Sequence, residues 1–311
     1  MDTAVTFPTS PKAVKAVPLK LSKRMSVEQA FQAIVHNCIG QVQANEVGVI
    51  KFHGVESLHQ MRVGLRRLRS ALSMFDELVQ LSPQLRGELE WLAEQLGPAR
   101  DWDVLAESTL ARVAQAVPMH LEIDEVKQAA LAKTHTLHDA AALAVSSERY
   151  AALMHALQRW VNEREWREML SPHAKTHIKM PIAAFARATL EKDQQRLKKR
   201  GRKLGGASVA ARHRVRIAAK KTRYAAEFFG SLYPGKQVRP YVKALARLQD
   251  ELGWINDAAV GERLLGELAE SRTELKNSTE FVRGYLAGSI DVGAEQLRKA
   301  WKNFAPLAAP N

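Results

Sequence analysis

The chain has 311 residues, of which 46% are hydrophobic, and it carries a formal net charge of +13 at pH 7. This composition is ordinary for a globular protein and excludes wholesale disorder, and no apolar run approaches the ~18–20 residues of a membrane span. The charge is concentrated, because the segment from Arg187 to Arg247 has 18 basic and three acidic residues, a net +15 that leaves −2 for the rest. Such a local excess favours an anionic partner.

The cysteine content and the first residues indicate the compartment. Cys38 is the only cysteine, so the chain can form no intramolecular disulfide and no cysteine-based zinc site. Residues 1–25 contain three prolines and five basic residues, and they lack the apolar stretch of a secretory signal. We therefore expect a cytoplasmic protein in which residues 1–25 form a flexible basic tail.

After this tail, nearly every segment has apolar residues at i, i+3, i+4 and i+7, the spacing that predicts an amphipathic helix. The expected helices cover residues 27–47, 58–81, 85–96, 104–117, 126–145, 150–170, 182–204, 209–232 and 238–252, with several more to about residue 304. We expect Pro83, Gly97–Pro98 and Gly205–Gly206 to end helices, and Ser146 and Ser147 to form a cap. The sequence thus predicts an all-α protein.

Two blocks of sequence recur in the same order. Residues 59–72 read HQMRVGLRRLRSAL and residues 213–226 read HRVRIAAKKTRYAA, so at an offset of 154 both give His-x-x-Arg-x-x-x-basic-basic-x-Arg. Downstream, LGPARDWDV at 96–104 matches LGWINDAAV at 252–260 at an offset of 156. Two ordered blocks at a nearly constant offset predict an internal duplication into two similar helical bundles.

Both copies of the first block place their charged residues on one side of a helix. With about 100° per residue, four polar or charged side chains of each copy fall within a stripe of about 80°, opposite an apolar stripe. They are His59, Arg62, Arg66 and Arg69 in the first copy and His213, Arg216, Lys220 and Arg223 in the second. Arg67 and Lys221 flank the stripes, and Glu56 and Glu227 are the only acidic residues near them. A solvated structural face would normally interleave more Glu, so the repetition favours a binding face.

A third basic run precedes the second copy. Arg196, Lys199, Arg200 and Lys203 follow i, i+3, i+4 and i+7 spacing and share one helical face. Because the first half has no equivalent run, we expect these residues to add to the binding pocket and to make it asymmetric in charge. The structural alternative is a solvated charge run at a frayed helix end.

The pattern of cations favours a repeating phosphate. Guanidinium groups match phosphate oxygens with paired hydrogen bonds, and a row of cations at ~5–6 Å spacing suits a repeating anion better than one small ligand. No helix-turn-helix, homeodomain or zinc-finger pattern is present, and the stripes lack the aromatic residues on which single-stranded nucleic acids stack. A base-free polyphosphate is the better match, and RNA or DNA is the alternative.

The paired basic blocks and the two LG segments resemble the signatures of the CHAD domain, the conserved histidine α-helical domain. The resemblance covers about residues 26–305 and implies two pseudo-symmetric four-helix bundles, residues 26–170 and residues 181–305, around a central basic groove. It also implies non-enzymatic binding of inorganic polyphosphate, and some members associate with polyphosphate or polyhydroxyalkanoate granules. The ligands that it implies here are His59, Arg62, Arg66, Arg67 and Arg69 with His213, Arg216, Lys220, Lys221 and Arg223.

The sequence departs from a symmetric motif at two places. Lys220 and Lys221 stand where the first copy has arginines, which keeps the charge but weakens bidentate contacts. Asn256 stands where the first copy has Arg100, which argues against a role for Arg100 in both halves. The Glu-x-Glu-x-Lys motif of the triphosphate tunnel domains often fused to this family is absent, so we expect a stand-alone binding module.

Acidic residues near the second signature raise the question of catalysis. Asp101, Asp103 and Asp257 follow glycines at expected helix starts, and we interpret them as N-caps that orient neighbouring arginines. The alternative is a phosphohydrolase that uses them to hold Mg²⁺. Because we find no Walker A loop and no nucleophile with an evident base, we expect neither catalysis nor a cofactor.

Histidines suggest two further hypotheses. The pairs His173–His177 and His135–His138 have spacings that can bind zinc, but neither pair has a clear third ligand, so we expect no metal site. His59 and His213 lie among cations, and bound phosphate should raise the pKa of both imidazoles. If they act as cationic donors, binding should be tighter at pH 6 than at pH 8.

Overall fold

The structure is a computed structural model that describes residues 11–116, 123–202, 204 and 208–311. Its α-helices are α1 Val27–Gln43, α2 Glu46–Phe52, α3 Val55–Met74, α4 Pro83–Asp103, α5 Leu110–Ala116, α6 Ile123–Val145, α7 Glu148–Glu163, α8 Pro172–His177, α9 Ile182–Gly201, α10 Val209–Phe229, α11 Gly235–Ser271 and α12 Lys276–Phe304. The π-helix η1, Val104–Thr109, separates α4 from α5. The described residues form no β-strand, only an isolated bridge between Ser26 and Pro181, so the all-α prediction is confirmed. None of the described helices is long and apolar enough to span a bilayer.

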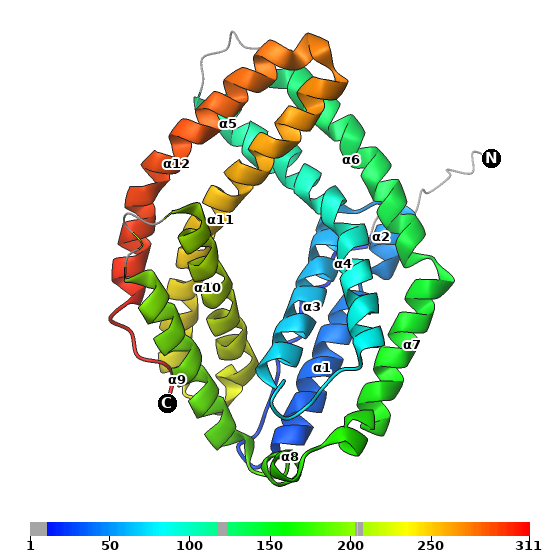
Figure 1. The fold of residues 1–311 in the computed structure, drawn as a ribbon, viewed down its shortest axis with the longest axis vertical. Coiled ribbons are helices and arrows are strands. Elements are labelled where there is room, and N and C mark those ends of the chain that lie inside the picture. Colours follow the sequence, from blue (N-terminus) through cyan, green and yellow to red (C-terminus); the bar gives the residue numbers. More distant parts are fainter. Residues whose placement is uncertain (1–10, 117–122, 203, 205–207) are drawn as a thin grey trace, which may run out of the picture.

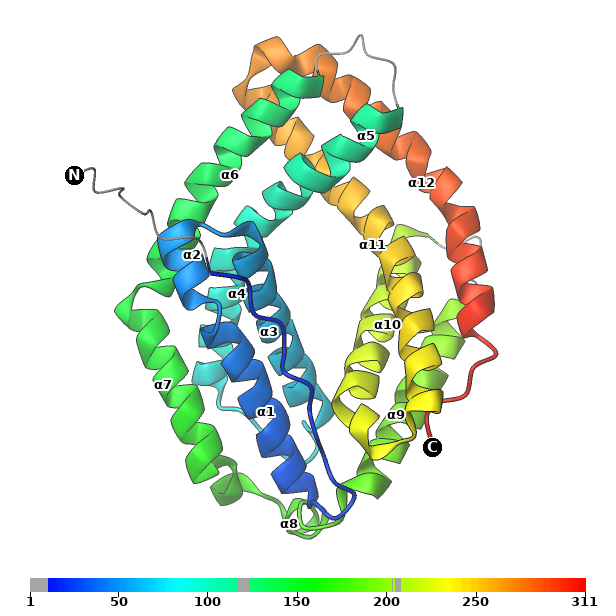
Figure 2. The same ribbon diagram turned by 180° about the vertical axis from the view of Figure 1, so that it is seen from behind.

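Two groups of helices stand on either side of the middle of the molecule (Figures 1 and 2). α1, α3, α4 and α7 form the first group, and α9, α10 and the first part of α11 form the second. α5, α6, α12 and the far part of α11 join the groups at one end, and α8 lies at the other. α3 and α10 are the inner helices, and they face each other across the middle.

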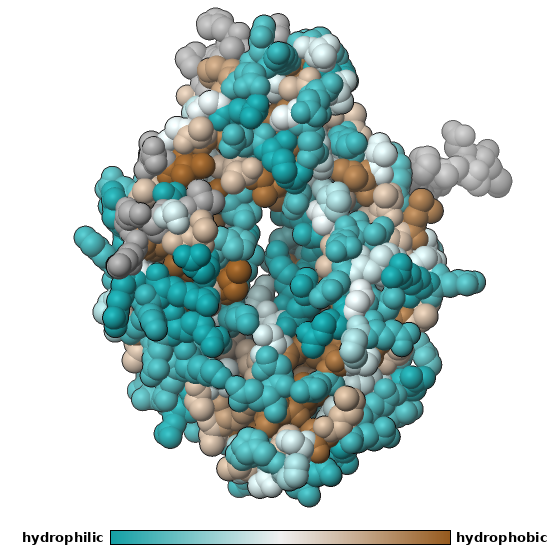
Figure 3. All heavy atoms as spheres, viewed as in Figure 1, coloured by the Kyte–Doolittle hydropathy of each residue, from teal (hydrophilic) through white to brown (hydrophobic). Residues whose placement is uncertain are grey.

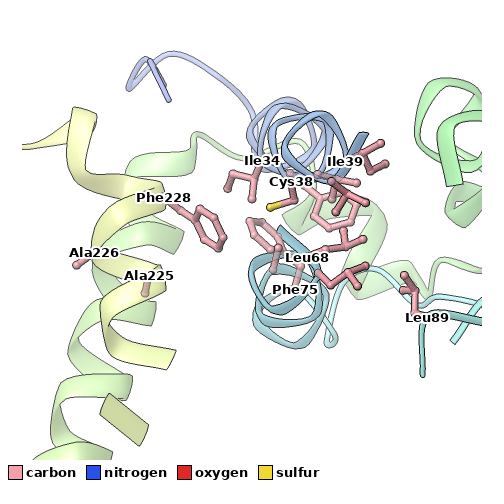
Figure 4. Packing of buried hydrophobic residues seen from close by; sticks show 14 of the residues in the cluster. Ile34, Cys38, Ile39, Leu68, Phe75, Leu89, Ala225, Ala226 and Phe228 are labelled. Carbon is pink, nitrogen blue, oxygen red and sulfur yellow. The ribbon is translucent and has the colours of Figure 1, made fainter. Parts of the chain in front are cut away.

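Aromatic side chains join the two groups at the α8 end. Phe75, which follows α3, stacks on Phe185 of α9 with ring centroids 4.6 Å apart, and its ring lies 6.4 Å from that of Phe229. Phe228 points from α10 toward α1 and α3, next to the buried Cys38 (Figure 4). Because this aromatic cluster fixes one end of the pair, α3 and α10 converge here and diverge toward the other end.

A second buried cluster closes the other end of the molecule. Trp102, Leu105 and Leu110, from the end of α4 to the start of α5, pack with Leu265 of α11 and Leu286 of α12. Helices from distant parts of the sequence therefore share one core there, and the helix pair α3 and α10 is held in place from both ends.

Two expected helix ends are wrong. α4 does not stop at Gly97–Pro98 but continues to Asp103, and α11 does not stop at residue 252 but runs for 37 residues, through Pro240, to Ser271. A proline inside a helix removes one hydrogen bond and adds steric strain. Leu96 and Ala99 of α4 are fully buried, so core packing holds the helix together across the proline.

The other helices exist with shifted bounds. The expected helix 27–47 divides into α1 and α2, because the Asn45 side chain donates its Nδ2–H to the carbonyl oxygen of Gln41 and so competes with helix continuation. Ser147 caps α7 as expected, since its Oγ accepts a hydrogen bond from the backbone N–H of Tyr150. The expected break at Gly205–Gly206 lies outside the described residues. The internal duplication and the division into two halves stay predictions.

Residues 11–25 differ from the flexible tail that the sequence suggested. They form an extended segment that runs beside α1 and α3 (Figure 2). Asn45 bonds both the N–H and the carbonyl oxygen of Val14, and the backbone N–H of Leu21 donates to Ser231 Oγ at 2.8 Å. Leu21 is buried. Side-chain hydrogen bonds and one apolar anchor thus hold this segment, a feature that its Pro-rich composition conceals, and residues 1–10 lie outside the described part.

Candidate anion-binding site

The packing of α3 turns its basic stripe toward α10. Met61, Leu65 and Leu68 are buried on the opposite face of the helix. Gly64 lies against α1, where an added Cβ would come within 2.8 Å of a Val42 side-chain carbon. This close approach of the two helices fixes α3 against its own group and leaves the arginine face directed toward the middle of the molecule.

α10 is oriented in the corresponding way. Val215, Ala219 and Ala226 are buried on its packing face, and Ser208 caps the helix by accepting a hydrogen bond from the backbone N–H of Ala211 at 3.3 Å. The opposite face carries basic residues toward α3. In the view of Figure 1, Figure 3 shows hydrophilic residues on both sides of a hollow in the middle of the molecule.

Four inner residues of the two stripes come together in what we call the central cation cluster. It consists of Arg62, Arg66, Arg216 and Lys220. Burial lowers the pKa of Lys220 to about 7, and the charges of Arg216 and Arg66 add to this shift. Burial also lowers the pKa of Arg216, with a contribution from Arg66 on the other helix. The charges of the inner residues of α3 and α10 thus act on one another across the gap, as expected for positions that converge.

The guanidinium groups of the central cation cluster are incompletely bonded. The Nε atoms of Arg62, Arg66 and Arg216 are buried and have no hydrogen-bond partner in the described structure. None of the four residues forms an ion pair with a described carboxylate within 4.0 Å, and the one hydrogen bond of Arg62 goes from Nη1 to the carbonyl oxygen of Ala93 at 3.3 Å. A buried donor without an acceptor costs free energy, so these groups are suited to receive an external anion.

Acidic residues lie near the cluster but not as the sequence suggested. Asp101 and Asp257 are inside α4 and α11, so the interpretation of these residues as N-caps is wrong, because the helices run through the glycines that precede them. Burial raises the pKa of Asp101, and the charge of Arg62 opposes that rise. Asp257 is the main charge that counteracts the lowering of the Arg216 pKa. The charges of the two acids thus act on equivalent arginines of the two copies.

Asp103 interacts with a histidine, unlike Asp101. Its Oδ1 lies 2.9 Å from Nε2 of His138 on α6, and both side chains are almost completely buried. Asp103 Oδ2 and His138 Nδ1 have no described partner. This pair links the end of α4, where the π-helix η1 begins, to α6. His135, three residues before His138, has a different partner, since its Nδ1 lies 3.4 Å from Asp139 Oδ2.

The flanking residues are bonded within the protein. Arg67 is 5% exposed, and it donates from Nη1 to Gln41 Oε1 and from Nη2 to Asn37 Oδ1, both at 2.8 Å. Its guanidinium lies 5.2 Å from the centroid of the Phe228 ring. Lys221 donates from Nζ to Ser73 Oγ at 2.9 Å. Both flanking cations therefore connect α3 and α10 in addition to any role with a ligand.

The ends of the two stripes differ. Arg69 is exposed and lines a pocket of about 440 Å³ with Arg62 and Arg66, together with Glu90 and Glu94. Arg223, by contrast, pairs with Glu227 at 2.7 Å.

The two motif histidines also lie in different surroundings. His59 is half-buried, whereas His213 is exposed. Burial and the charge of Arg100 lower the pKa of His59 to about 4. A cationic His59 in the complex therefore requires that bound phosphate raise this pKa, and tighter binding at pH 6 than at pH 8 stays a prediction.

The third basic run is dispersed. Arg196 lies 3.7 Å from Asp193 and lines a separate pocket of about 210 Å³ that also includes Lys221. Arg200 donates to the carbonyl oxygen of Arg214, and Lys199 is exposed. Lys203 lies outside the described residues. The structure thus places Arg196 near Lys221 but gives Lys199 and Arg200 no position in the central cation cluster.

The sequence missed a groove on the face opposite that of Figure 1. This back groove, of about 1020 Å³, is lined by His59, Gln60 and Arg67 of the first motif, Arg223 and Glu227 of the second, and Lys15, Arg239 and Lys243 elsewhere in the chain. The spacing of Arg239 and Lys243, four residues apart, could have indicated a further basic face. The placement of Lys15 depends on the tertiary hydrogen bonds of residues 11–25.

The histidine pairs do not form a metal site in the described residues, where no group of three or more His, Cys, Asp or Glu side chains is arranged to hold a metal ion. His173 and His177 stack with ring centroids 3.8 Å apart, and His177 Nδ1 lies 2.9 Å from the carbonyl oxygen of His173.

Comparisons with known proteins agree with the fold and the motifs. The family model of the CHAD domain matches residues 33–266. The structure is similar to the crystal structure of the CHAD domain from the plant Ricinus communis, with a TM-score of 0.87 and 38% identity over 96% of this chain and 99% of that chain. It is also similar to PptA from Streptomyces chartreusis, with a TM-score of 0.66 and 15% identity over 89% and 100%, a likeness that shows the fold alone. No curated protein matches the sequence.

The matched segment begins in α1 and ends in α11, and it contains both basic motifs and both LG segments. It covers more than half of the chain, and the similarity to the plant domain extends over nearly all of it. The resemblance that the sequence suggested is confirmed, and this chain belongs to the CHAD domain family.

Proposed function

We propose that this protein binds inorganic polyphosphate in the central cation cluster and does not cleave it. The observation that carries the proposal is the set of three buried Nε–H groups, on Arg62, Arg66 and Arg216, that lack a described hydrogen-bond partner. A phosphate oxygen is the acceptor that matches a guanidinium group in both charge and geometry. Membership of the CHAD family, which is linked to polyphosphate binding, supports the same ligand.

The surroundings of the cluster favour a chain of phosphates over a single ion. Cations continue along both helices at intervals of three or four residues, which corresponds to ~5–6 Å between neighbouring side chains. The back groove and the pocket beside Arg69 have no Phe, Tyr or Trp among their lining residues. Base stacking, which supports binding of single-stranded nucleic acids, has no platform there. A base-free polyanion therefore fits better than RNA or DNA.

Binding without hydrolysis follows from the placement of the acids. The positive charges of Arg62 and Arg216 act on Asp101 and Asp257, and they oppose the approach of Mg²⁺. Among the described residues, no group of three or more His, Cys, Asp or Glu side chains is arranged to hold a metal ion, as a metal-dependent phosphohydrolase requires. Incubation with polyphosphate and Mg²⁺ should accordingly release no phosphate.

We also propose a cytoplasmic location, with recruitment to polyphosphate or polyhydroxyalkanoate granules as a consequence of chain binding. The buried, free thiol of Cys38 is compatible with a reducing compartment. Granule recruitment requires no further site, because a granule-bound polyphosphate chain offers the ligand that the central cation cluster accepts.

The test removes one guanidinium group from each inner helix. Charge-assisted hydrogen bonds contribute about 1.5–3 kcal/mol each, so Arg62→Gln and Arg216→Gln should each weaken polyphosphate binding by roughly 10- to 100-fold. Titration calorimetry at several salt concentrations measures the affinity. In wild type the affinity should fall steeply with salt, because binding releases condensed counterions.

Lys133→Gln provides the control, since Lys133 is exposed on α6 and its removal changes the net charge by the same amount. Unchanged affinity in both arginine variants would reject the central cation cluster as the site. Displacement of polyphosphate by heteropolymeric RNA at equal phosphate concentration would show that the protein is a nucleic-acid binder instead.

A further inference from the structure

α11 carries a basic stripe that lies outside the two motifs. Lys236, Arg239, Lys243 and Arg247 are spaced by three or four residues and fall within about 80° on the helix. All four are exposed, and none forms an ion pair with a carboxylate of the described residues. Like charges at this spacing repel each other, so the stripe is unfavourable without a negatively charged partner.

Two of the four residues of the stripe line the back groove. Arg239 and Lys243 line the groove with Val238, Val242 and Ala246 from the same side of α11. Lys236 and Arg247 lie within one turn of them on the adjoining part of the helix surface. Figure 2 shows the first part of α11 beside α10 on this side of the molecule, with residues 11–25 crossing toward α8.

The groove also contains one residue from each end of the proposed site. His59 stands one turn before Arg62 on α3, and Arg223 stands one turn after Lys220 on α10. One turn corresponds to ~5 Å along the helix axis. A linear anion that leaves the central cation cluster therefore has about one helical turn to cover before it reaches the back groove.

The segment of residues 11–25 supplies a further cation. Lys15 lines the groove, and neighbouring residues of the segment are fixed, because Asn45 holds Val14 and Asn37 Nδ2 donates to the carbonyl oxygen of Val17 at 2.7 Å. The one carboxylate among the lining residues, that of Glu227, is paired with Arg223. The groove as a whole thus has a large excess of positive charge.

We propose that the back groove is a second arm of the polyphosphate site, which only long chains occupy. The inference rests on the proposed function, and it assigns Arg239 and Lys243 as the residues that discriminate chain length. A short chain is bound within the central cation cluster. A longer chain continues into the back groove and along α11, where the stripe from Lys236 to Arg247 extends for ~17 Å.

The experiment measures the affinity of two ligands, tripolyphosphate and a long-chain polyphosphate preparation. Each is titrated into wild type and into the double variant Arg239→Gln/Lys243→Gln. Both residues are exposed and Gln has similar helix propensity, so the fold should persist. The variant should bind long chains about tenfold more weakly, at a few-fold per exposed charge contact, and tripolyphosphate no more than about twofold more weakly. The slope of log affinity against log salt should become shallower by about 1 to 2 for long chains only.

The matched control is Lys127→Gln/Lys133→Gln on α6, which removes the same charge outside the back groove. Arg66→Gln, in contrast, should weaken the binding of both ligands. Equal losses for short and long chains in the α11 variant, or a loss as large in the α6 control, would overturn the second arm and leave polyphosphate binding intact. If wild type binds neither ligand, the proposed function itself is wrong.

Discussion

α3 and α10 can be compared position by position, because both carry the basic motif and both face the middle of the molecule. At the inner positions, Arg62 corresponds to Arg216 and Arg66 to Lys220, and all four lie together without an ion pair to a described carboxylate. The flanking and outer positions differ. The shared sequence pattern therefore produces a shared environment only at the centre of each helix.

The difference arises from what each helix packs against. Arg67 of α3 is buried and bonded to two amide oxygens of α1, whereas Lys221 of α10 is half-buried and bonds to one hydroxyl of α3. Arg69 has no described ion pair, and Arg223 is paired with Glu227. One basic motif thus divides into positions whose cations lack a described ion pair and positions that hold the helices together.

The largest difference between the two helices should appear in stability. Arg67→Met leaves the amide oxygens of Gln41 and Asn37 without a donor, and buried unpaired groups of this kind cost about 1–3 kcal/mol. Lys221→Met loses one hydrogen bond at a half-buried place and should cost less than about 1 kcal/mol. Urea unfolding measures both free energies. Equal losses in the two variants would show that the flanking positions have the same role.

The sequence predicted best the features that depend on residues close together in the chain. Helix periodicity and the two stripes followed from the spacing of apolar and basic residues, and the inner positions of the stripes do converge. The continuation of α4 through Pro98 did not follow, because it depends on the tertiary packing of Leu96 and Ala99. The same limit explains why the helix ends were the least accurate part.

Electrostatic properties of the site were the hardest to predict. Whether a motif arginine is free, as Arg62 is at Nε, or bonded, as Arg67 is, depends on side chains of α1 that no local pattern connects to α3. The sequence suggested His59 and His213 as the titrating groups, whereas burial and the charge of Arg100 lower the pKa of His59 to about 4. Burial lowers the pKa of Lys220 to about 7, so we expect this lysine, which stands where the first copy has an arginine, to titrate near neutral pH.

The effect of intermediate size should be a pH dependence of polyphosphate affinity, which we expect to come from Lys220 and not from its counterpart Arg66. In the free protein the Lys220 pKa is lowered to about 7, mainly by burial and also by the charges of Arg216, Arg66 and Arg62, while Asp257 opposes this shift. A bound polyanion favours the ammonium form and raises this pKa. Because Lys220 loses its proton as pH rises through 7, affinity should fall by about tenfold from pH 6 to pH 8.

Titration with long-chain polyphosphate, in which only the terminal groups change their ionisation in this range, measures the dependence. Lys220→Arg should bind at pH 6 at least as tightly as wild type and remove most of the decrease, since guanidinium groups stay protonated. An equally steep decrease in Lys220→Arg would assign the pH dependence to another group.

The smallest effect concerns the outer positions, where the pairing of Arg223 with Glu227 is the difference from Arg69. Glu227→Gln should release Arg223 and make α10 resemble α3, which should raise polyphosphate affinity by about 2- to 3-fold, the range of a partly exposed ion pair. Glu163→Gln on α7 is the control, because it adds the same net charge at an exposed position outside the back groove. If both variants raise affinity equally, net charge alone accounts for the gain and the two outer positions are equivalent. A gain in Glu227→Gln alone, seen only with long chains, would show that Arg223 contacts the ligand where it enters the back groove.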